Sequence, residues 1–316
     1  MGNASLKKIA VLTSGGDAPG MNAAIRAVVR TANYHKIECV GVRGGYTGLI
    51  EGNFTKMGPR SVSNIINLGG TILRSARSKE FRTEEGRQKA FEQCQKNGID
   101  ALVCIGGDGT FTGAKIFAEE FGVKVIGVPG TIDNDIYGTD FTIGYDTALN
   151  TAMEAIDKIR DTATSHNRVF FIEVMGRDAG FIALNSGIAS GALDILIPEK
   201  KDSLEDLFET FEKAQKRGKT SSIVIVAEGE RLASTYELAE QTKQRFPDYD
   251  IRVSILGHIQ RGGAPSCADR VLASRMGYGA VVGLMKGLTN VMAGIRSNDL
   301  VFTPIEDAIK KHNEIN

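Results

Sequence analysis

Eight short apolar runs rich in β-branched residues recur along this chain, and they constrain its fold more than any other feature. They are residues 8–14, 37–42, 100–107, 123–128, 168–174, 193–198, 221–228 and 251–257. Most lack strict alternation of apolar and polar residues, which is typical of strands covered on both faces. Segments with helical periodicity lie between them, most clearly at 21–34, 84–98, 147–163 and 203–218. This order predicts an α/β protein with mostly parallel sheets flanked by helices.

The length of the chain indicates more than one hydrophobic core. A domain usually holds about 100–200 residues, and this chain has 316. We therefore expect two Rossmann-like lobes.

The charge balance excludes one class of function. Lys plus Arg and Asp plus Glu both number 38, which argues against a general nucleic-acid binder because such proteins usually carry a basic excess. The four cysteines are widely spaced and form no C-x-x-C pair. No run of about 18 apolar residues occurs, so we expect a cytoplasmic protein.

Glycines and charged residues gather where several of the apolar runs end. The stretches are "TSGGDAPG", "GGDGT", "PGTIDND", "MGRDAG", "AEGER" and "GHIQRGG". In open parallel sheets, ligands bind outside the carboxyl ends of the strands. Glycines that served only as turns would be spread over both ends of the sheets. We therefore expect an active-site cleft between the two lobes, lined by loops from both halves of the chain.

Two of these stretches are suited to bind phosphate. Residues 14–22, "SGGDAPGMN", and residues 106–114, "GGDGTFTGA", each lead into a predicted helix. A helix N-terminus offers bare N–H groups and a partial positive charge. Neither stretch has the dinucleotide spacing or the Lys-Ser/Thr of a Walker loop. Ordinary helix-entry turns remain the alternative.

Asp108 and several arginines complement these loops. Asp108 in "GGDGT" fits a helix N-cap, and it equally fits a ligand of Mg²⁺, which usually takes one or two carboxylates together with substrate phosphates. Arginine suits bidentate phosphate binding, although a single surface arginine is most often only solvated. The arginines at strand or loop edges are Arg77, Arg168, Arg177, Arg252 and Arg261.

Residues 129–136, "PGTIDNDI", place Asp133 and Asp135 directly after an apolar run. Alone, the stretch is typical of an acidic turn, because Pro, Gly, Asp and Asn are all common in turns. At a strand end among Gly-rich loops, it also suits a general base that takes a proton from a substrate.

Taken together, the motifs resemble the bacterial ATP-dependent 6-phosphofructokinase family. "SGGDAPGMNAAIRA", "GGDGT", "PGTIDNDI", "MGRDAG" and "LGHIQRGG" follow in the family's order and approximate spacing, from residue 8 to about residue 300. "GGDGT" alone is weak, since NAD kinases and lipid kinases carry it too. "PGTIDND" and "GHIQRGG" in one chain are specific.

The resemblance implies a glycolytic enzyme that transfers the γ-phosphoryl group of ATP to the 1-hydroxyl of fructose 6-phosphate, with Mg²⁺. It implies an ATP-binding lobe of residues 1–144 plus 260–305. It also implies a fructose 6-phosphate-binding lobe of residues 145–259 plus 306–316, and a homotetramer.

The resemblance also implies roles for individual residues. The ATP side consists of Gly16, Arg77, Ser78, Gly107, Asp108, Gly109 and Thr110, with Asp108 as the metal-associated residue. Catalysis falls to Asp133 as general base, with Thr131, Asp135 and Arg77. The sugar phosphate is bound by Thr131, Ile132, Asp133, Met175, Gly176, Arg177, Glu228, His258 and Arg261. Arg168 and Arg252 reach the site from a neighbouring subunit.

Two glycines indicate the phosphoryl donor. Pyrophosphate-dependent relatives typically carry Asp at the position of Gly109 and Lys at the position of Gly130. A bulky charged side chain there would fill space that an adenosine-bearing donor needs. The resemblance therefore favours ATP over pyrophosphate.

The family's effector site, for ADP or GDP as activator and phosphoenolpyruvate as inhibitor, is matched in part. The matching residues are Arg26, Arg30, Arg60, Arg160, Gly191, Arg217 and Lys219. Leu193 replaces a frequent acid, Thr220 a lysine and Asn64 an aspartate. We hypothesise weak or altered allostery.

Three other functions compete with this interpretation. An NAD kinase-like enzyme would explain "GGDGT" but not the sugar-phosphate motifs "MGRDAG" and "GHIQRGG". A pyrophosphate-dependent phosphofructokinase is the second alternative. The third is a two-lobed sugar-phosphate-binding sensor without catalysis, which would not need the carboxylates Asp108, Asp133 and Asp135.

Overall fold

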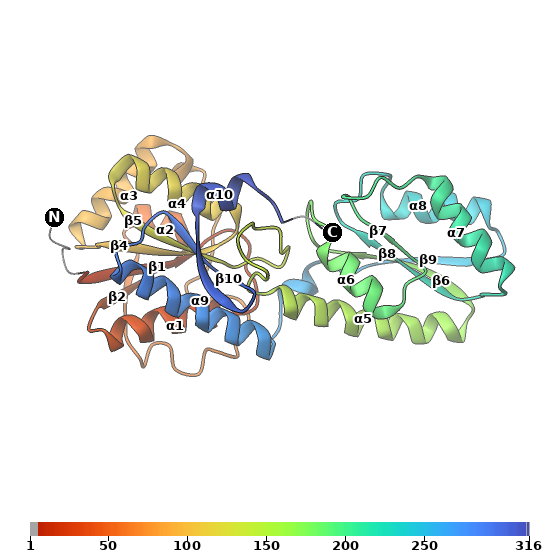
Figure 1. Cartoon of the computed structure of the whole chain (residues 1–316), viewed down its shortest axis with the longest axis horizontal. Coiled ribbons are helices and arrows are strands. Elements are labelled where there is room, and N and C mark those ends of the chain that lie inside the picture. Colours follow the sequence, from red (N-terminus) through yellow and green to blue (C-terminus); the bar gives the residue numbers. More distant parts are fainter. Residues whose placement is uncertain (1–5, 314, 316) are drawn as a thin grey trace. The chain divides into compact units, whose positions relative to one another are not determined.

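The computed structural model describes residues 6–313 and residue 315, and it divides the chain into two compact units (Figure 1). Unit 1 comprises residues 6–132, Ile136–Thr147 and Arg261–Asn313. Unit 2 comprises Asp133–Asp135, Ala148–Gln260 and residue 315. Within the described part of the chain, no helix combines the length and the apolar character needed to cross a membrane.

Unit 1 contains a seven-stranded sheet in the order β11-β10-β5-β4-β1-β2-β3. The strands are β1 (Lys8–Thr13), β2 (Glu38–Val42), β3 (Phe54–Met57), β4 (Ala101–Gly106), β5 (Lys124–Pro129), β10 (Val291–Arg296) and β11 (Asp299–Pro304). The five inner strands run parallel, whereas β3 and β11 pair antiparallel at the two edges. All six residues of β4 are buried, because helices cover both faces of a parallel sheet.

Helices cover the two faces of this sheet. They are α1 (Met21–Tyr34), α2 (Gly45–Glu51), α3 (Glu84–Lys96), α4 (Asp108–Phe121), α9 (Cys267–Met285) and α10 (Ile305–Lys310), with a short 3₁₀ turn η1 (Glu80–Arg82). Figure 1 shows α3, α4 and α10 along one face and α1 beside α9 along the other. Phe111 and Phe117 of α4 are fully buried in the core of the first face.

The assignment of residues 306–316 to the second lobe was wrong for residues 306–313, which belong to unit 1. Ile305 and Ala308 are fully buried and pack with the core residues of β4, β5 and α4. The apolar face of this short helix therefore fixes it to the first sheet. Residues 314 and 316 lie outside the described residues.

Unit 2 contains a four-stranded parallel sheet in the order β7-β8-β6-β9. Its strands are β6 (Arg168–Val174), β7 (Asp194–Leu196), β8 (Ser222–Ala227) and β9 (Asp250–Ile255). Its helices are α5 (Tyr145–Ser165), α6 (Phe181–Ser190), α7 (Leu204–Lys216) and α8 (Thr235–Arg245), followed by the 3₁₀ turn η2 (Gly257–Arg261). Figure 1 shows α5 and α6 along one face of the sheet and α7 and α8 along the other. Phe171 of β6 and Phe211 of α7 stack in the core of this unit.

All eight predicted strands are present, and so are the four helices that the periodicity indicated most clearly. The predicted class, mostly parallel sheets flanked by helices, is confirmed. Three further strands, β3, β10 and β11, complete the first sheet.

Candidate active site

Three Gly-rich loops meet at one edge of the sheet in unit 1. They follow β1, β4 and β5, which are adjacent and parallel, so their carboxyl ends share this edge. The loops are also hydrogen-bonded to the neighbouring strands. The Ser14 N–H donates to the Ile105 carbonyl at 3.0 Å, the Thr110 hydroxyl donates to the Ser14 carbonyl at 3.0 Å, and the Gly130 N–H donates to the Gly106 carbonyl at 3.0 Å. These contacts give the edge a defined backbone shape.

Glycine is required where β4 enters α4. A Cβ at Gly106 would overlap the Ser14 carbonyl oxygen and the Thr110 hydroxyl. Gly107 is the N-cap of α4 and has no side chain to cap the helix, while a Cβ at Gly109 would meet nothing within 4 Å. The first turn of this 14-residue helix is therefore open beside its N-terminal N–H groups, which is the geometry of an anion site.

Asp108 is the first residue of α4. The described residues contain no group of three or more His, Cys, Asp or Glu side chains that could hold a metal ion by themselves. One carboxylate beside an open helix N-terminus instead fits Mg²⁺ bound largely by substrate phosphates, since Mg²⁺ usually takes only one or two protein carboxylates.

The loop after β1 contacts two segments that are distant in sequence. The Ser75 hydroxyl donates a hydrogen bond to the Gly15 carbonyl, which joins the segment containing Arg77 and Ser78 to this loop. Arg261 lies against the same loop, because a Cβ at Gly16 would be only 2.5 Å from its Nη1. The structure thus brings together Gly16, predicted for the nucleotide, and Arg261, predicted for the sugar phosphate.

The loop after β5 carries the two aspartates of "PGTIDNDI". The Thr142 hydroxyl donates to the Thr131 carbonyl at 2.7 Å, and a Cβ at Gly107 would be 3.8 Å from the Cβ of Thr131. Asn134 adopts a left-handed conformation, with φ at 55°. Asp133 is 9% exposed, so its carboxyl group lies in a largely dehydrated setting.

In unit 2, three loops again share the carboxyl edge of a sheet, after the adjacent strands β6, β8 and β9. The Arg177 N–H donates to Glu228 Oε2 at 3.2 Å, and the side chain of Arg177 is exposed. Arg177 has a positive φ of 57° and Gly176 a φ of 149°. A Cβ at Gly229 would overlap the Arg177 carbonyl, so the two loops lie directly against one another. The structure brings together Met175, Gly176, Arg177 and Glu228, which the resemblance assigned to the sugar phosphate.

Gln260 supports this edge, although the sequence analysis did not assign it a role. Its buried side chain accepts a hydrogen bond from the Met175 N–H at 3.3 Å and donates to the Gly257 carbonyl at 3.0 Å. It thereby joins the loops after β6 and β9 and holds η2, which presents the exposed His258. The sequence signal that could have identified Gln260 is its position inside the motif "GHIQRGG".

Asp269 is a second support that sequence reasoning missed. Its buried carboxylate accepts hydrogen bonds from the Gly144 N–H at 2.8 Å and from the Thr147 N–H at 2.8 Å. Burial raises the pKa of this carboxyl group, and the hydrogen bonds from Thr147 and Gly144 oppose that shift. Asp269 thereby fixes the start of α5 to the start of α9 within unit 1.

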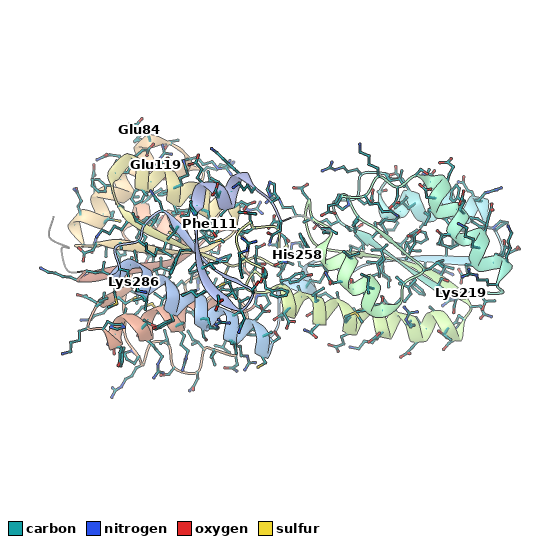
Figure 2. The ribbon with its side chains drawn as sticks, viewed as in Figure 1. Glu84, Phe111, Glu119, Lys219, His258 and Lys286 are labelled. Atoms are coloured by element: carbon teal, nitrogen blue, oxygen red, sulfur yellow. The ribbon has the colours of Figure 1, made fainter. Side chains whose placement is uncertain are left out.

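Arg168 and Arg252 do not lie with the other predicted sugar-phosphate residues of unit 2. Arg168 is the first residue of β6 and Arg252 the third of the six residues of β9, whereas Arg177 and His258 follow the carboxyl ends of these strands. Figure 2 shows the two ends of this unit, with His258 near one and Lys219 near the other. The pair contacts Asp250, a residue that the sequence analysis did not single out.

The predicted effector residues fall in both units. In unit 2, the Arg160 guanidinium donates to the Ser190 carbonyl beside Gly191, and the Tyr249 hydroxyl donates to the Lys219 carbonyl at 2.9 Å. Arg217 is the C-cap of α7. Arg26 and Arg30 lie on α1 in unit 1. Arg60 also belongs to unit 1 but lies outside α1.

The substituted effector positions have structural roles of their own. Leu193 packs on the core of unit 2. The Thr220 hydroxyl donates to Asn167 Oδ1 at 2.9 Å. Asn64 has a positive φ of 56°, which asparagine tolerates better than most residues.

Sequence comparisons find one protein family over most of the chain. The family model described as Phosphofructokinase matches residues 8–284. The chain is 56% identical over 311 residues to ATP-dependent 6-phosphofructokinase 2 of Bacteroides thetaiotaomicron, covering 98% of this chain and 95% of that protein. It is 55% identical to ATP-dependent 6-phosphofructokinase 1 of Thermus thermophilus, covering 98% and 96%.

Solved structures of phosphofructokinases have the same fold as this chain. A phosphofructokinase from Saccharomyces cerevisiae matches with a TM-score of 0.92 and 38% identity, covering 96% of this chain and 45% of that one. A pyrophosphate-dependent phosphofructokinase from Marinobacter aquaeolei matches with a TM-score of 0.85, covering 98% of this chain and 86% of that one. Its identity of 22% supports a shared fold only.

Proposed function

The chain belongs to the phosphofructokinase family, and we propose that it transfers the γ-phosphoryl group of ATP to the 1-hydroxyl of D-fructose 6-phosphate, a step of glycolysis. The products are fructose 1,6-bisphosphate and ADP. The observation that carries this proposal is the position of the family motifs, which form the carboxyl edges of both sheets. The non-catalytic sensor is disfavoured, because the matched relatives are enzymes. We keep the cytoplasm as the expected compartment.

We assign the nucleotide to the loops of unit 1. The N–H groups at the start of α4 and the loop after β1 bind the phosphates of ATP, with Arg77 and Ser78 beside them. Arg77 is the proposed cation that offsets charge on the transferring group. This division supports, in part, the predicted ATP-binding lobe of residues 1–144 plus 260–305.

Asp108 is the residue that would hold Mg²⁺ with the nucleotide. When bound, the ion neutralises charge on the phosphates during transfer. Asp135, two residues after the proposed base, is proposed as a supporting carboxylate.

Asp133 is the proposed general base for the sugar 1-hydroxyl. A hydroxyl is a poor nucleophile at neutral pH, and a positioned carboxylate that accepts its proton makes it a better one. Thr131 and Ile132 line the reacting end of the sugar. Arg177, Glu228, His258 and Arg261, with Met175 and Gly176, bind the rest of fructose 6-phosphate.

The placement of Arg168 and Arg252 supports a site shared between subunits. The seven residues of β6 separate Arg168 from the loop that carries Arg177. At about 3.3 Å per residue this is roughly 20 Å, far beyond the reach of an arginine side chain. We therefore propose that Arg168, together with Arg252, to which Asp250 joins it, binds sugar phosphate held by another copy, within a homotetramer.

The surroundings of Gly109 and Gly130 support ATP as the donor. At Gly109 the structure leaves open space beside the helix N-terminus, and an aspartate would place a second negative charge there. A Cβ at Gly130 would be 3.1 Å from Met21 Cε and 3.2 Å from Ile105 Cγ2, so a lysine there would require both side chains to shift by a few tenths of an ångström. Neither position favours pyrophosphate.

A coupled assay with fructose 6-phosphate, Mg²⁺ and either donor tests the proposal. We expect kcat/KM with ATP to exceed that with pyrophosphate by at least about 100-fold, because only ATP supplies the binding energy of adenosine. Equal or better turnover with pyrophosphate would reverse the donor assignment. No turnover with either donor would favour the sensor.

The same assay addresses the effectors ADP, GDP and phosphoenolpyruvate. Leu193 offers no carboxylate for a metal-bound nucleotide, and Thr220 lacks the ammonium group of lysine. We expect weak inhibition by phosphoenolpyruvate and little relief by ADP. Strong inhibition that ADP fully relieves would refute altered allostery.

A further inference from the structure

Asp250 contacts both arginines that stand apart from the other sugar-phosphate residues. Its Oδ2 accepts a hydrogen bond from Arg168 Nε at 2.6 Å, and its Oδ1 lies 3.0 Å from Arg252 Nε. Arg252 Nη2 also donates to Oδ2 at 3.3 Å. One carboxylate thus bridges two guanidinium groups.

The backbone register brings these three residues together. Arg168 and Asp250 are direct partners at the start of the parallel strands β6 and β9. Arg252 is two residues further along β9, so its side chain lies on the same face of the strand as that of Asp250. The cluster is therefore set by the sheet rather than by a loop.

The charges explain what the carboxylate contributes. Two neighbouring guanidinium groups repel one another, and a shared carboxylate offsets this repulsion. The hydrogen bond from Arg168 and then the contacts with Arg252 lower the pKa of Asp250, so it stays ionised at neutral pH. The cluster keeps a net positive charge, and the contact with Arg168 uses Nε, leaving its two Nη nitrogens outside that hydrogen bond. Those nitrogens carry N–H groups suited to a phosphate.

We propose that Asp250 is a positioning residue that aligns Arg168 and Arg252 for the phosphate of fructose 6-phosphate bound by another copy of the chain. This rests on the proposed function. Asp250 itself touches no reacting atom, so its effect is on sugar-phosphate binding rather than on the chemical step.

Kinetics of Asp250→Asn test the proposal. We expect the KM for fructose 6-phosphate to rise about tenfold, by analogy with metal sites, where loss of a residue that orients a ligand costs about 10- to 100-fold. The KM for ATP and the kcat stay within about twofold, and Asp250→Glu restores part of the affinity because the charge returns. Asp248→Asn is the matched control, since Asp248 is an exposed carboxylate two residues earlier. We expect the KM of this variant for fructose 6-phosphate to stay unchanged. An unchanged KM in Asp250→Asn, or equal rises for both substrates, overturns the proposal.

Mixed oligomers test the action on another copy. Chains with Asp133→Ala and chains with Asp250→Asn are co-expressed and separated from the unmixed forms by different tags. Some sites then combine Asp133 of one chain with an intact arginine pair of the other, and we expect activity with the low KM of the unaltered protein to reappear. Mixed oligomers that show only the high KM of Asp250→Asn contradict the proposal, and so does an active monomer. Failure of the proposed function is distinct, because the unaltered chain would then show no turnover.

Discussion

Replacing Asp133 with alanine is expected to lower kcat by about 10²- to 10⁴-fold, the range that a positioned general base contributes. Asp133 is 9% exposed in the loop after β5, so bulk water is poorly placed to substitute for it as a proton acceptor. Fructose 6-phosphate binding should stay within about tenfold, because the phosphate-binding residues remain. Steady-state kinetics and calorimetric titration of the sugar phosphate give the two quantities.

Two further variants make the Asp133 result specific. Asp133→Asn keeps the shape of the side chain but removes the base. Its kcat should therefore be nearly as low as that of the alanine variant. Asp140→Asn is the control, since Asp140 is an exposed carboxylate in the same connection between β5 and α5, and kcat should stay within about twofold. Near-normal turnover of Asp133→Ala would remove Asp133 from the role of base.

The central strands could be predicted because strands buried on both faces have continuous apolar sequences. Both β4 and β8 are buried at every residue, so no periodicity of polar residues interrupts them. The hairpin of β10 and β11 gave a weaker signal. Its turn places Ser297 and Asn298 at positive φ, without the Asn-Gly or Asp-Gly pair that usually marks such a turn.

In the candidate site, too, some residues could be predicted from the sequence and others could not. Its loops are contiguous in sequence and follow recognisable strands, so their residues could be located before the structure. The supporting residues could not, because their partners are remote. Asp269 holds Thr147, which is 122 residues away, and Asp250 holds Arg168, which is 82 residues away. Only the pairing of strands and the packing of helix ends bring such residues together.

Gly16→Ala is expected to lower kcat/KM for fructose 6-phosphate by about 10- to 100-fold. The new Cβ would be 2.5 Å from Nη1 and 3.3 Å from Cζ of Arg261, so the guanidinium must leave its place. It is the end of a flexible side chain and moves at little cost to the fold, so the melting temperature should change little. A hydrogen bond to a charged group contributes about 1.5–3 kcal/mol, which corresponds to the expected factor.

The two KM values separate this effect from a direct effect on the nucleotide loop. If Arg261 carries the effect, the KM for fructose 6-phosphate rises and the KM for ATP does not. Adding Gly16→Ala to Arg261→Ala should then cost little more, because both changes remove the same interaction. Gly58→Ala is the matched control, since a Cβ there would meet nothing within 4 Å. A rise confined to the KM for ATP would mean that Gly16 is required by the nucleotide and not by Arg261.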